Sequence, residues 1–203
     1  RTTHTGRRLL ALTVCLTLSS VAYAQISVHL DADRDEFLTY ESIPISVSLR
    51  NVSGRNIQIE QVDDQSWLEF FVTDDRGESI PATDKTVAGG SALIPAGQTV
   101  GHRVDLVTLY QLRTHGSFRV QATVVSGGQK FTSPPFRFTI LDGRPLWSKT
   151  MGLPSREGAA DEYRTYNLLE GKIARASTMY VCVREEAKGL IYGMLSLGSY
   201  LSI

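Results

Sequence analysis

The sequence predicts an all-β protein built around an antiparallel β-sandwich, and three observations support this prediction. Apolar and polar residues alternate in short runs, as expected for strands with one buried face and one face in water. Gly, Pro, Asn and Asp separate these runs, and no stretch of useful length has the period of a helix. Roughly seven such strands between residues 25 and 142 are typical of two packed sheets.

The alternating runs give the expected strands in order along the chain. The clearest one places Ile45, Val47 and Leu49 on one face and polar residues on the other. Residues 80–98 are rich in Gly, Pro, Ala and Thr, so we expect a long, loosely structured connection there. The expected strands cover 26–30, 43–49, 57–61, 67–73, 100–106, 118–124 and 136–140.

Two stretches of the chain carry a family resemblance. In 35–54 an acidic residue precedes an alternating strand that ends in Asn51-Val-Ser-Gly54. In 95–120 a Pro-Ala-Gly turn leads to a strand, a short loop and then Gly116-Ser-Phe-Arg-Val120. Through these features residues 26–142 resemble bacterial immunoglobulin-like domains of the macroglobulin and BsuPI proteinase-inhibitor kind. The resemblance implies an immunoglobulin-like β-sandwich, a fold that serves as spacer, adhesion module, inhibitor or enzyme appendage.

The chain changes character after Asp142. Residues 143–160 are expected to form a linker with an embedded apolar patch, and 161–203 a β-rich second segment. Three strands in so short a segment bury only a marginal core of their own. The segment could pack back on the sandwich, begin a second domain, or be cut short, and the apolar end of the sequence favours a truncated domain. The three expected strands cover 163–169, 178–185 and 190–201.

The first 24 residues have the order of a secretory signal peptide. A basic pair at 7–8 precedes an apolar run at 9–18, and Ala22 and Ala24 supply the small residues of a cleavage site. The apolar run is too short for a membrane span, which needs about 20 residues. We therefore expect an exported protein, periplasmic or extracellular, with no transmembrane span in the mature chain.

The net charge and the cysteine content exclude some kinds of partner and of covalent cross-link. The 21 basic residues include three in the signal peptide, which leaves 18 against 21 acidic residues in the mature chain. This balance argues against a nucleic-acid partner, because phosphates are neutralised by clustered basic residues. Cys15 would leave with the signal peptide, so Cys182 stands alone without an internal disulfide. We expect Cys182 to be a small buried apolar residue, with a reactive or intermolecular thiol as the alternative.

The sequence shows no motif of a catalytic or metal site. A Gly-x-Ser-x-Gly nucleophile elbow is absent, and the three histidines of the mature chain have no paired spacing. Asp31, Asp33 and Asp35 alternate as in a calcium loop, but the glycine and glutamate that such a loop needs are missing at their positions. We therefore expect a solvated acidic turn there, no cofactor, and no enzymatic activity.

Aromatic residues are the remaining candidates for a binding site. Such residues could form an exposed platform for a protein partner or for sugar rings. For Trp67 and Phe71 the sequence favours burial within the sandwich over an exposed apolar patch. We predict an exported, non-catalytic interaction or spacer module of the cell envelope or secreted fraction. The alternatives are an accessory N-terminal domain of a longer secreted enzyme and a carbohydrate-binding module. The candidate binding residues are Trp67, Phe71, Tyr110 and Trp147.

Overall fold

The computed structural model describes residues 25–60, 66–87, 90–153, 162–173, 176–185 and 190–199. Within these ranges the chain forms fourteen strands and one four-residue helix, α1 (Leu106–Leu109), so the predicted all-β fold class is confirmed. The expected signal peptide, residues 1–24, lies outside the described residues. None of the helical structure in the described part is long and apolar enough to cross a membrane.

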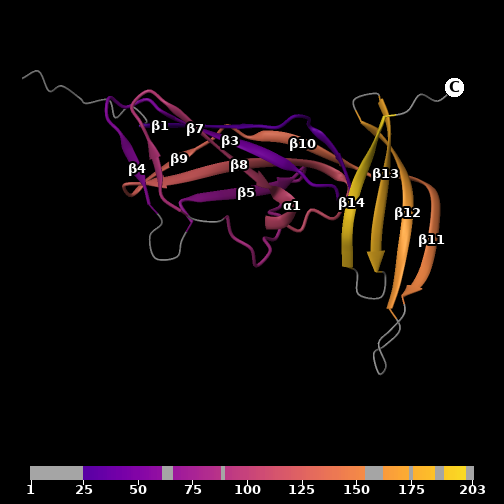
Figure 1. Ribbon diagram of the computed structural model, residues 1–203. Coiled ribbons are helices and arrows are strands. Elements are labelled where there is room, and N and C mark those ends of the chain that lie inside the picture. Colours follow the sequence, from indigo (N-terminus) through magenta and orange to yellow (C-terminus); the bar gives the residue numbers. More distant parts are fainter. Residues whose placement is uncertain are drawn as a thin grey trace, which may run out of the picture.

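Ten strands form the sandwich (Figure 1). They are β1 (Ile26–Asp31), β2 (Glu36–Leu38), β3 (Pro44–Asn51), β4 (Ile57–Ile59), β5 (Leu68–Asp74), β6 (Ala92–Ile94), β7 (Thr99–Asp105), β8 (Gly116–Ser126), β9 (Gln129–Thr132) and β10 (Phe136–Leu141). One sheet has the order β1-β3-β7, and the other has the order β2-β10-β8-β5 with β9 also paired to β8. β4 and β6 form a separate antiparallel pair, which places a strand inside the connection expected at 80–98.

The two sheets bury one apolar core between them. Val47 of the first sheet and Val72 and Val120 of the second are fully buried, and all three belong to a single cluster. Phe138 stacks on Phe118 with 5.5 Å between ring centroids, and such ring pairs add to the stability gained by burial. Core side chains come from alternate residues of each strand, as the sequence pattern predicts for a sandwich.

One strand pair departs from the expected antiparallel arrangement. β2 runs parallel to β10, with Phe37 opposite Ile140. The chain leaves the first sheet after β1, crosses to the second within the short segment 32–35, and continues in β2 at the edge of the second sheet. β2 has only three residues, too few to show an alternating pattern in the sequence.

Asn51 anchors the turn at the end of β3. The residue is fully buried, and its side-chain Nδ2 donates to the carbonyl oxygens of Arg55 and Ile94, each at 2.8 Å. Its Oδ1 accepts a hydrogen bond from the backbone N–H of Ser53 at 2.9 Å. A buried amide with both ends satisfied fixes the turn and ties it to β6.

The last four strands form an antiparallel sheet that stands across one end of the sandwich (Figure 1). They are β11 (Arg144–Leu153), β12 (Glu162–Ile173), β13 (Ala176–Glu185) and β14 (Leu190–Ser199). The prediction of a linker over 143–160 is wrong for β11, which pairs with β12 along most of its length. Nearly every side chain of β11 is exposed, so the strand carries no alternation of buried residues that the sequence could reveal.

Candidate functional site

Trp67, one of the four aromatic residues predicted to bind a partner, is part of the core. Its side chain is 7% exposed, and its Nε1–H donates a hydrogen bond to the carbonyl oxygen of Gly90 at 2.7 Å. Its ring also meets the ring of His102 edge-on. Trp67 therefore stabilises the sandwich, and the small part of it that is exposed lines a surface pocket of about 390 Å³.

Phe71 and Tyr110 lie apart from each other. Phe71 is 54% exposed on the outer face of β5, where the residues two positions away, Glu69 and Thr73, are polar. Tyr110 follows α1 and is half-buried, with its hydroxyl donating to the carbonyl oxygen of Phe70. Burial raises the pKa of Tyr110. Tyr110 lines a pocket of about 420 Å³ together with Phe70, and Phe71 is not among the residues that line it.

Trp147 lies on β11, in the C-terminal sheet, and its side chain is 51% exposed. The four aromatic candidates thus occupy separate places: the core, the outer face of β5, the end of α1 and the C-terminal sheet. A platform for sugar rings needs aromatic faces that lie side by side. Trp147 is exposed and pairs with an apolar residue of the next strand, Leu168.

The C-terminal sheet contacts the sandwich through a small apolar cluster. Leu38 of β2 packs with Ile173 and Tyr180, which come from β12 and β13. Gly171 makes this contact possible, because a Cβ atom on it would lie 2.8 Å from Cδ1 of Leu38 and 3.0 Å from Cε2 of Tyr180. The side chain of Leu38 is therefore shared by the two units.

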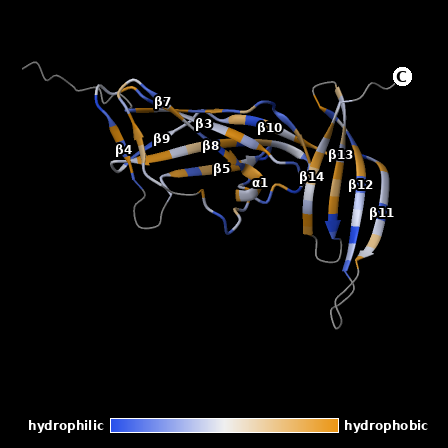
Figure 2. Cartoon of the chain, in the orientation of Figure 1, coloured by the Kyte–Doolittle hydropathy of each residue, from blue (hydrophilic) through white to orange (hydrophobic). Residues whose placement is uncertain are grey.

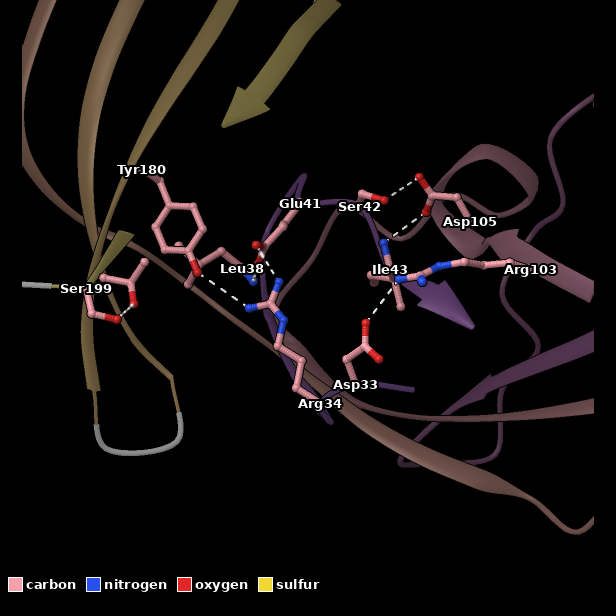
Figure 3. A network of polar contacts seen from close by, with 11 residues as sticks. Asp33, Arg34, Leu38, Glu41, Ser42, Ile43, Arg103, Asp105, Tyr180 and Ser199 are labelled. Carbon is pink, nitrogen blue, oxygen red and sulfur yellow. Dashed lines mark hydrogen bonds and ion pairs between the residues drawn. The ribbon is translucent and has the colours of Figure 1, made fainter. Parts of the chain in front are cut away.

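A polar network borders this cluster (Figure 3). The guanidinium of Arg34 pairs with Oε1 of Glu41, and its Nη1 donates to the hydroxyl of Tyr180 at 3.4 Å. The other oxygen of Glu41, Oε2, accepts the backbone N–H of Leu38 at 2.9 Å, so this 8%-exposed carboxylate has partners on both oxygens. Although burial lowers the pKa of Arg34, the hydrogen bond and charge of Glu41 hold it above its ordinary value. Arg34 is thus held within the sandwich by its ion pair with Glu41 and reaches the C-terminal sheet through its hydrogen bond to Tyr180.

The acidic turn at 31–35 takes part in surface pairing. Asp33 accepts a hydrogen bond from Nη2 of Arg103 at 3.1 Å, and both side chains are exposed (Figure 3). In the part of the chain that the structure describes, no group of three or more His, Cys, Asp and Glu is arranged to hold a metal ion.

The C-terminal sheet has two faces of different character. The face toward the sandwich carries the inner row, which we define as Ser148, Asn167, Cys182 and Met194, paired across the four strands. The opposite face carries the outer row, which we define as Trp147, Leu168, Val181 and Leu195, again paired across the four strands. Cys182 is buried, as predicted, and burial raises the pKa of its thiol.

A pocket of about 440 Å³ lies between the inner row and the sandwich. Asn167 and Cys182 contribute from the sheet, and Arg113 and His115 from the loop before β8. His115 Nδ1 pairs with Oδ2 of Asp142 at 2.8 Å. The pocket therefore combines a buried amide and a buried thiol with exposed charged groups at its rim.

The fold and these sites define an all-β protein in which a β-sandwich carries a docked four-stranded sheet. No protein family model matches the chain, and no curated protein sequence matches it. Among solved structures, the sporulation control protein Spo0M from Bacillus subtilis is similar, with 13% sequence identity and a TM-score of 0.43. The match covers 87% of this chain and 91% of that chain. A likeness of this size gives no indication of function.

Sequence reasoning missed the residues that meet at the junction. Asn167 lies in β12 between Tyr166 and Leu168, and it was not among the candidates predicted from the sequence. Glu41 stands in the stretch that carries the family resemblance, yet its burial depends on Arg34 and on the backbone of Leu38. A polar residue on the inner face of a strand pattern is the signal that could have found Asn167.

Proposed function

We propose that this protein is an exported, non-catalytic interaction module in which an immunoglobulin-like sandwich carries a sheet whose outer face binds another protein. The observation that carries this proposal is the outer row. Its residues extend over all four strands of the C-terminal sheet, and Trp147 and Leu195 at its two ends are 51% and 65% exposed.

The outer row is a continuous apolar surface. Trp147 pairs with Leu168, Leu168 with Val181, and Val181 with Leu195, so each side chain is beside the next across the sheet. Figure 2 shows apolar residues along β13 and β14 in this sheet. Removing a large apolar side chain from water contributes about 1.5–3 kcal/mol, and contiguous exposed patches of this kind mark interaction sites.

Polar groups border the outer row at the end where β12 begins. The guanidinium of Arg164 lies 4.4 Å from the ring centroid of Tyr192, and the Tyr192 hydroxyl donates to Oε2 of Glu185 at 2.7 Å. Protein interfaces commonly have this anatomy, with an apolar centre containing Trp and a polar rim with Arg and Tyr. The arrangement supports a protein as the partner.

The remaining parts of the proposal come from the sequence. The signal-peptide pattern supports export, and the resemblance of residues 26–142 supports the immunoglobulin-like kind of sandwich. Within the sandwich, the apolar side chains of the facing sheets are used in one shared core. We therefore assign the sandwich the role of a spacer that holds the C-terminal sheet.

Site-specific photo-cross-linking in cells that make the protein tests the proposal. A photo-reactive amino acid at Leu195 is expected to form a discrete adduct with one protein, and the same group at Leu93 is not. Leu93 is a matched control, because it is 54% exposed and lies on β6 at the other end of the sandwich. Absence of an adduct at Leu195, or the same adducts from both positions, would overturn the proposal. An adduct of twice the chain mass would identify a second copy as the partner.

A further inference from the structure

We infer that the pocket of about 440 Å³ between the C-terminal sheet and the sandwich, which we call the junction pocket, binds an organic ligand. In this ligand a carboxylate stands close to an amide, as in an N-acylated amino acid or the C-terminus of a peptide. This site goes beyond the interaction surface proposed above and does not depend on it. The pocket lies on the inner face of the C-terminal sheet, whereas the outer row lies on the opposite face.

Asn167 is the strongest sign that the pocket receives a ligand. Its side chain lines the pocket and the residue is only 8% exposed, yet its amide makes no hydrogen bond to any residue that the structure describes. The amide therefore faces the open space of the pocket, where it is available to a ligand. A ligand group that both donates and accepts, such as an amide, would satisfy Asn167 on both sides.

The charges around the pocket favour an anion. Asp142 is already satisfied, since one oxygen pairs with His115 and the other accepts the hydroxyl of Thr39 at 2.9 Å. Arg113, on the loop before β8, also lines the pocket. The Arg113 guanidinium makes no ion pair with the described residues. A planar guanidinium binds a carboxylate through two parallel hydrogen bonds, which accounts for the carboxylate half of the ligand.

The walls of the pocket determine how large a ligand it can hold and where that ligand can be apolar. Leu169 and Pro145 line one side, and the volume of about 440 Å³ falls within the range of small-molecule sites. An inorganic anion would leave the apolar wall without contacts. An apolar side chain next to the carboxylate, as in leucine, would fill this space.

Tyr40 adds a separate observation on the sandwich side of the pocket. It has φ of 72°, in the left-handed region, and follows Thr39 in a turn closed by the hydrogen bond from the Glu41 N–H to the Leu38 carbonyl at 2.9 Å. Glycine would adopt this conformation without strain, and residues held in strained backbone tend to lie at functional sites. The ring of Tyr40 is therefore the side chain that we expect to cover a bound ligand.

Isothermal titration of the full chain with N-acetyl-L-leucine tests the inference. We expect one molecule to bind per chain, and its C-terminal amide, N-acetyl-L-leucinamide, to bind at least about tenfold more weakly because the charge-assisted bonds are lost. Inorganic phosphate is expected to bind at least about tenfold more weakly than the acid, because it has no apolar group to cover the wall formed by Leu169 and Pro145. No binding of the acid at millimolar concentration, or equal binding of acid, amide and phosphate, would overturn the inference.

Two variants and a control locate the site. Arg113→Gln, at an exposed position, is expected to weaken binding about tenfold by removing a charge-assisted bond, whereas Arg55→Gln at the other end of the sandwich leaves it unchanged. Tyr40→Gly is expected to weaken binding while the melting temperature stays the same or rises, since strain is released. Equal weakening by Arg55→Gln and Arg113→Gln, or no weakening by Tyr40→Gly, would count against the pocket.

A second titration distinguishes the two sources of the ligand. A pentapeptide that ends in leucine with a free carboxylate is compared with N-acetyl-L-leucine on the same protein. Tighter binding of the peptide identifies a protein C-terminus as the source, and equal or weaker binding identifies a free small acid. Both results support the shared chemistry, and the failure of both probes contradicts it. Neither result bears on cross-linking at Leu195, so the two proposals fail or succeed separately.

Discussion

The sandwich and the C-terminal sheet obtain their stability in different ways. The sandwich encloses a cluster of 22 buried apolar residues between two sheets. The C-terminal sheet shares a cluster of three buried residues, and one of these, Leu38, belongs to the sandwich. Its ladders are long, with strands of ten to twelve residues, but only its inner face is covered by the described part of the chain.

The C-terminal sheet therefore depends on the sandwich for its core. Hydrogen-bonded ladders alone contribute little net free energy, because the unfolded backbone bonds to water equally well. An isolated sheet needs a partner surface that buries its apolar face. The inner face obtains that surface at Leu38 and through Arg34, whereas the outer row is left for a partner under the proposed function.

The largest difference in the free energy of unfolding is expected between a substitution at Phe138 in the sandwich core and one at Leu195 in the C-terminal sheet. Phe138→Ala is expected to lower the free energy of unfolding by about 3–5 kcal/mol, because the ring is 2% exposed and contacts Phe37 and Phe118. Leu195→Ala, at a residue that is 65% exposed, should change it by less than about 0.5 kcal/mol. Urea unfolding of the two variants measures both values. Similar losses would mean that the outer row is covered in the free protein.

A smaller effect is expected at the contact between the two regions. Gly171→Ala places a methyl group against the buried side chains of Leu38 and Tyr180, and such overpacking costs about 1–3 kcal/mol. The loss should fall on the C-terminal sheet, so amides of β12 and β13 exchange faster while those of β3 and β8 keep their protection. Gly193→Ala is the matched control, because nothing lies within 4 Å of a Cβ at that position. Hydrogen exchange that quickens equally in all four strands would show that the two regions unfold together.

The smallest expected effect is a pH dependence that originates at Cys182. Burial raises the pKa of this thiol in the folded state, so the unfolded chain loses the proton first as the pH rises. The stability from the buried neutral thiol is complete below the ordinary pKa of about 8.5 and is lost as the pH rises toward the folded value. The free energy of unfolding should therefore fall from pH 8 to 9.5 more steeply in the native chain than in Cys182→Ala. Parallel pH profiles of the two proteins would contradict this assignment.

The sequence was sufficient to predict the sandwich strands because each buries alternate residues. β3 and β8 show this directly, since their apolar residues recur at every second position. β2, β6 and β9 were missed because each has three or four residues that do not alternate cleanly between buried and exposed. β4 is equally short but was predicted, because Ile57 and Ile59 flank the polar Gln58. β11 was missed for another reason: its exposed side chains carry no burial pattern, and its pairing with β12 is visible only in the folded chain.

The candidate site was less predictable than the fold. Residue type singled out Trp67 and Trp147 equally, and only the tertiary structure separates the buried ring from the exposed one. Asn167 and Arg113 lie more than 50 positions apart in the sequence, and they meet at one pocket because the C-terminal sheet docks beside the loop before β8. Contacts of this kind depend on how the C-terminal sheet packs against the sandwich. The periodicity of a single strand carries no information on that packing.

The parallel pairing of β2 with β10 has a consequence for the order of folding. The hydrogen bond between Thr39 and Asp142, next to this pair, joins residues 103 positions apart, so the loop it closes includes nearly the whole sandwich. Closing so long a loop is entropically costly, and contacts of this kind form late. Leu38, the residue that receives the C-terminal sheet, lies at the end of β2. During synthesis the C-terminal sheet should therefore find its docking surface only after β2 has paired with β10, the last strand of the sandwich. Its attachment would then indicate that the sandwich has formed.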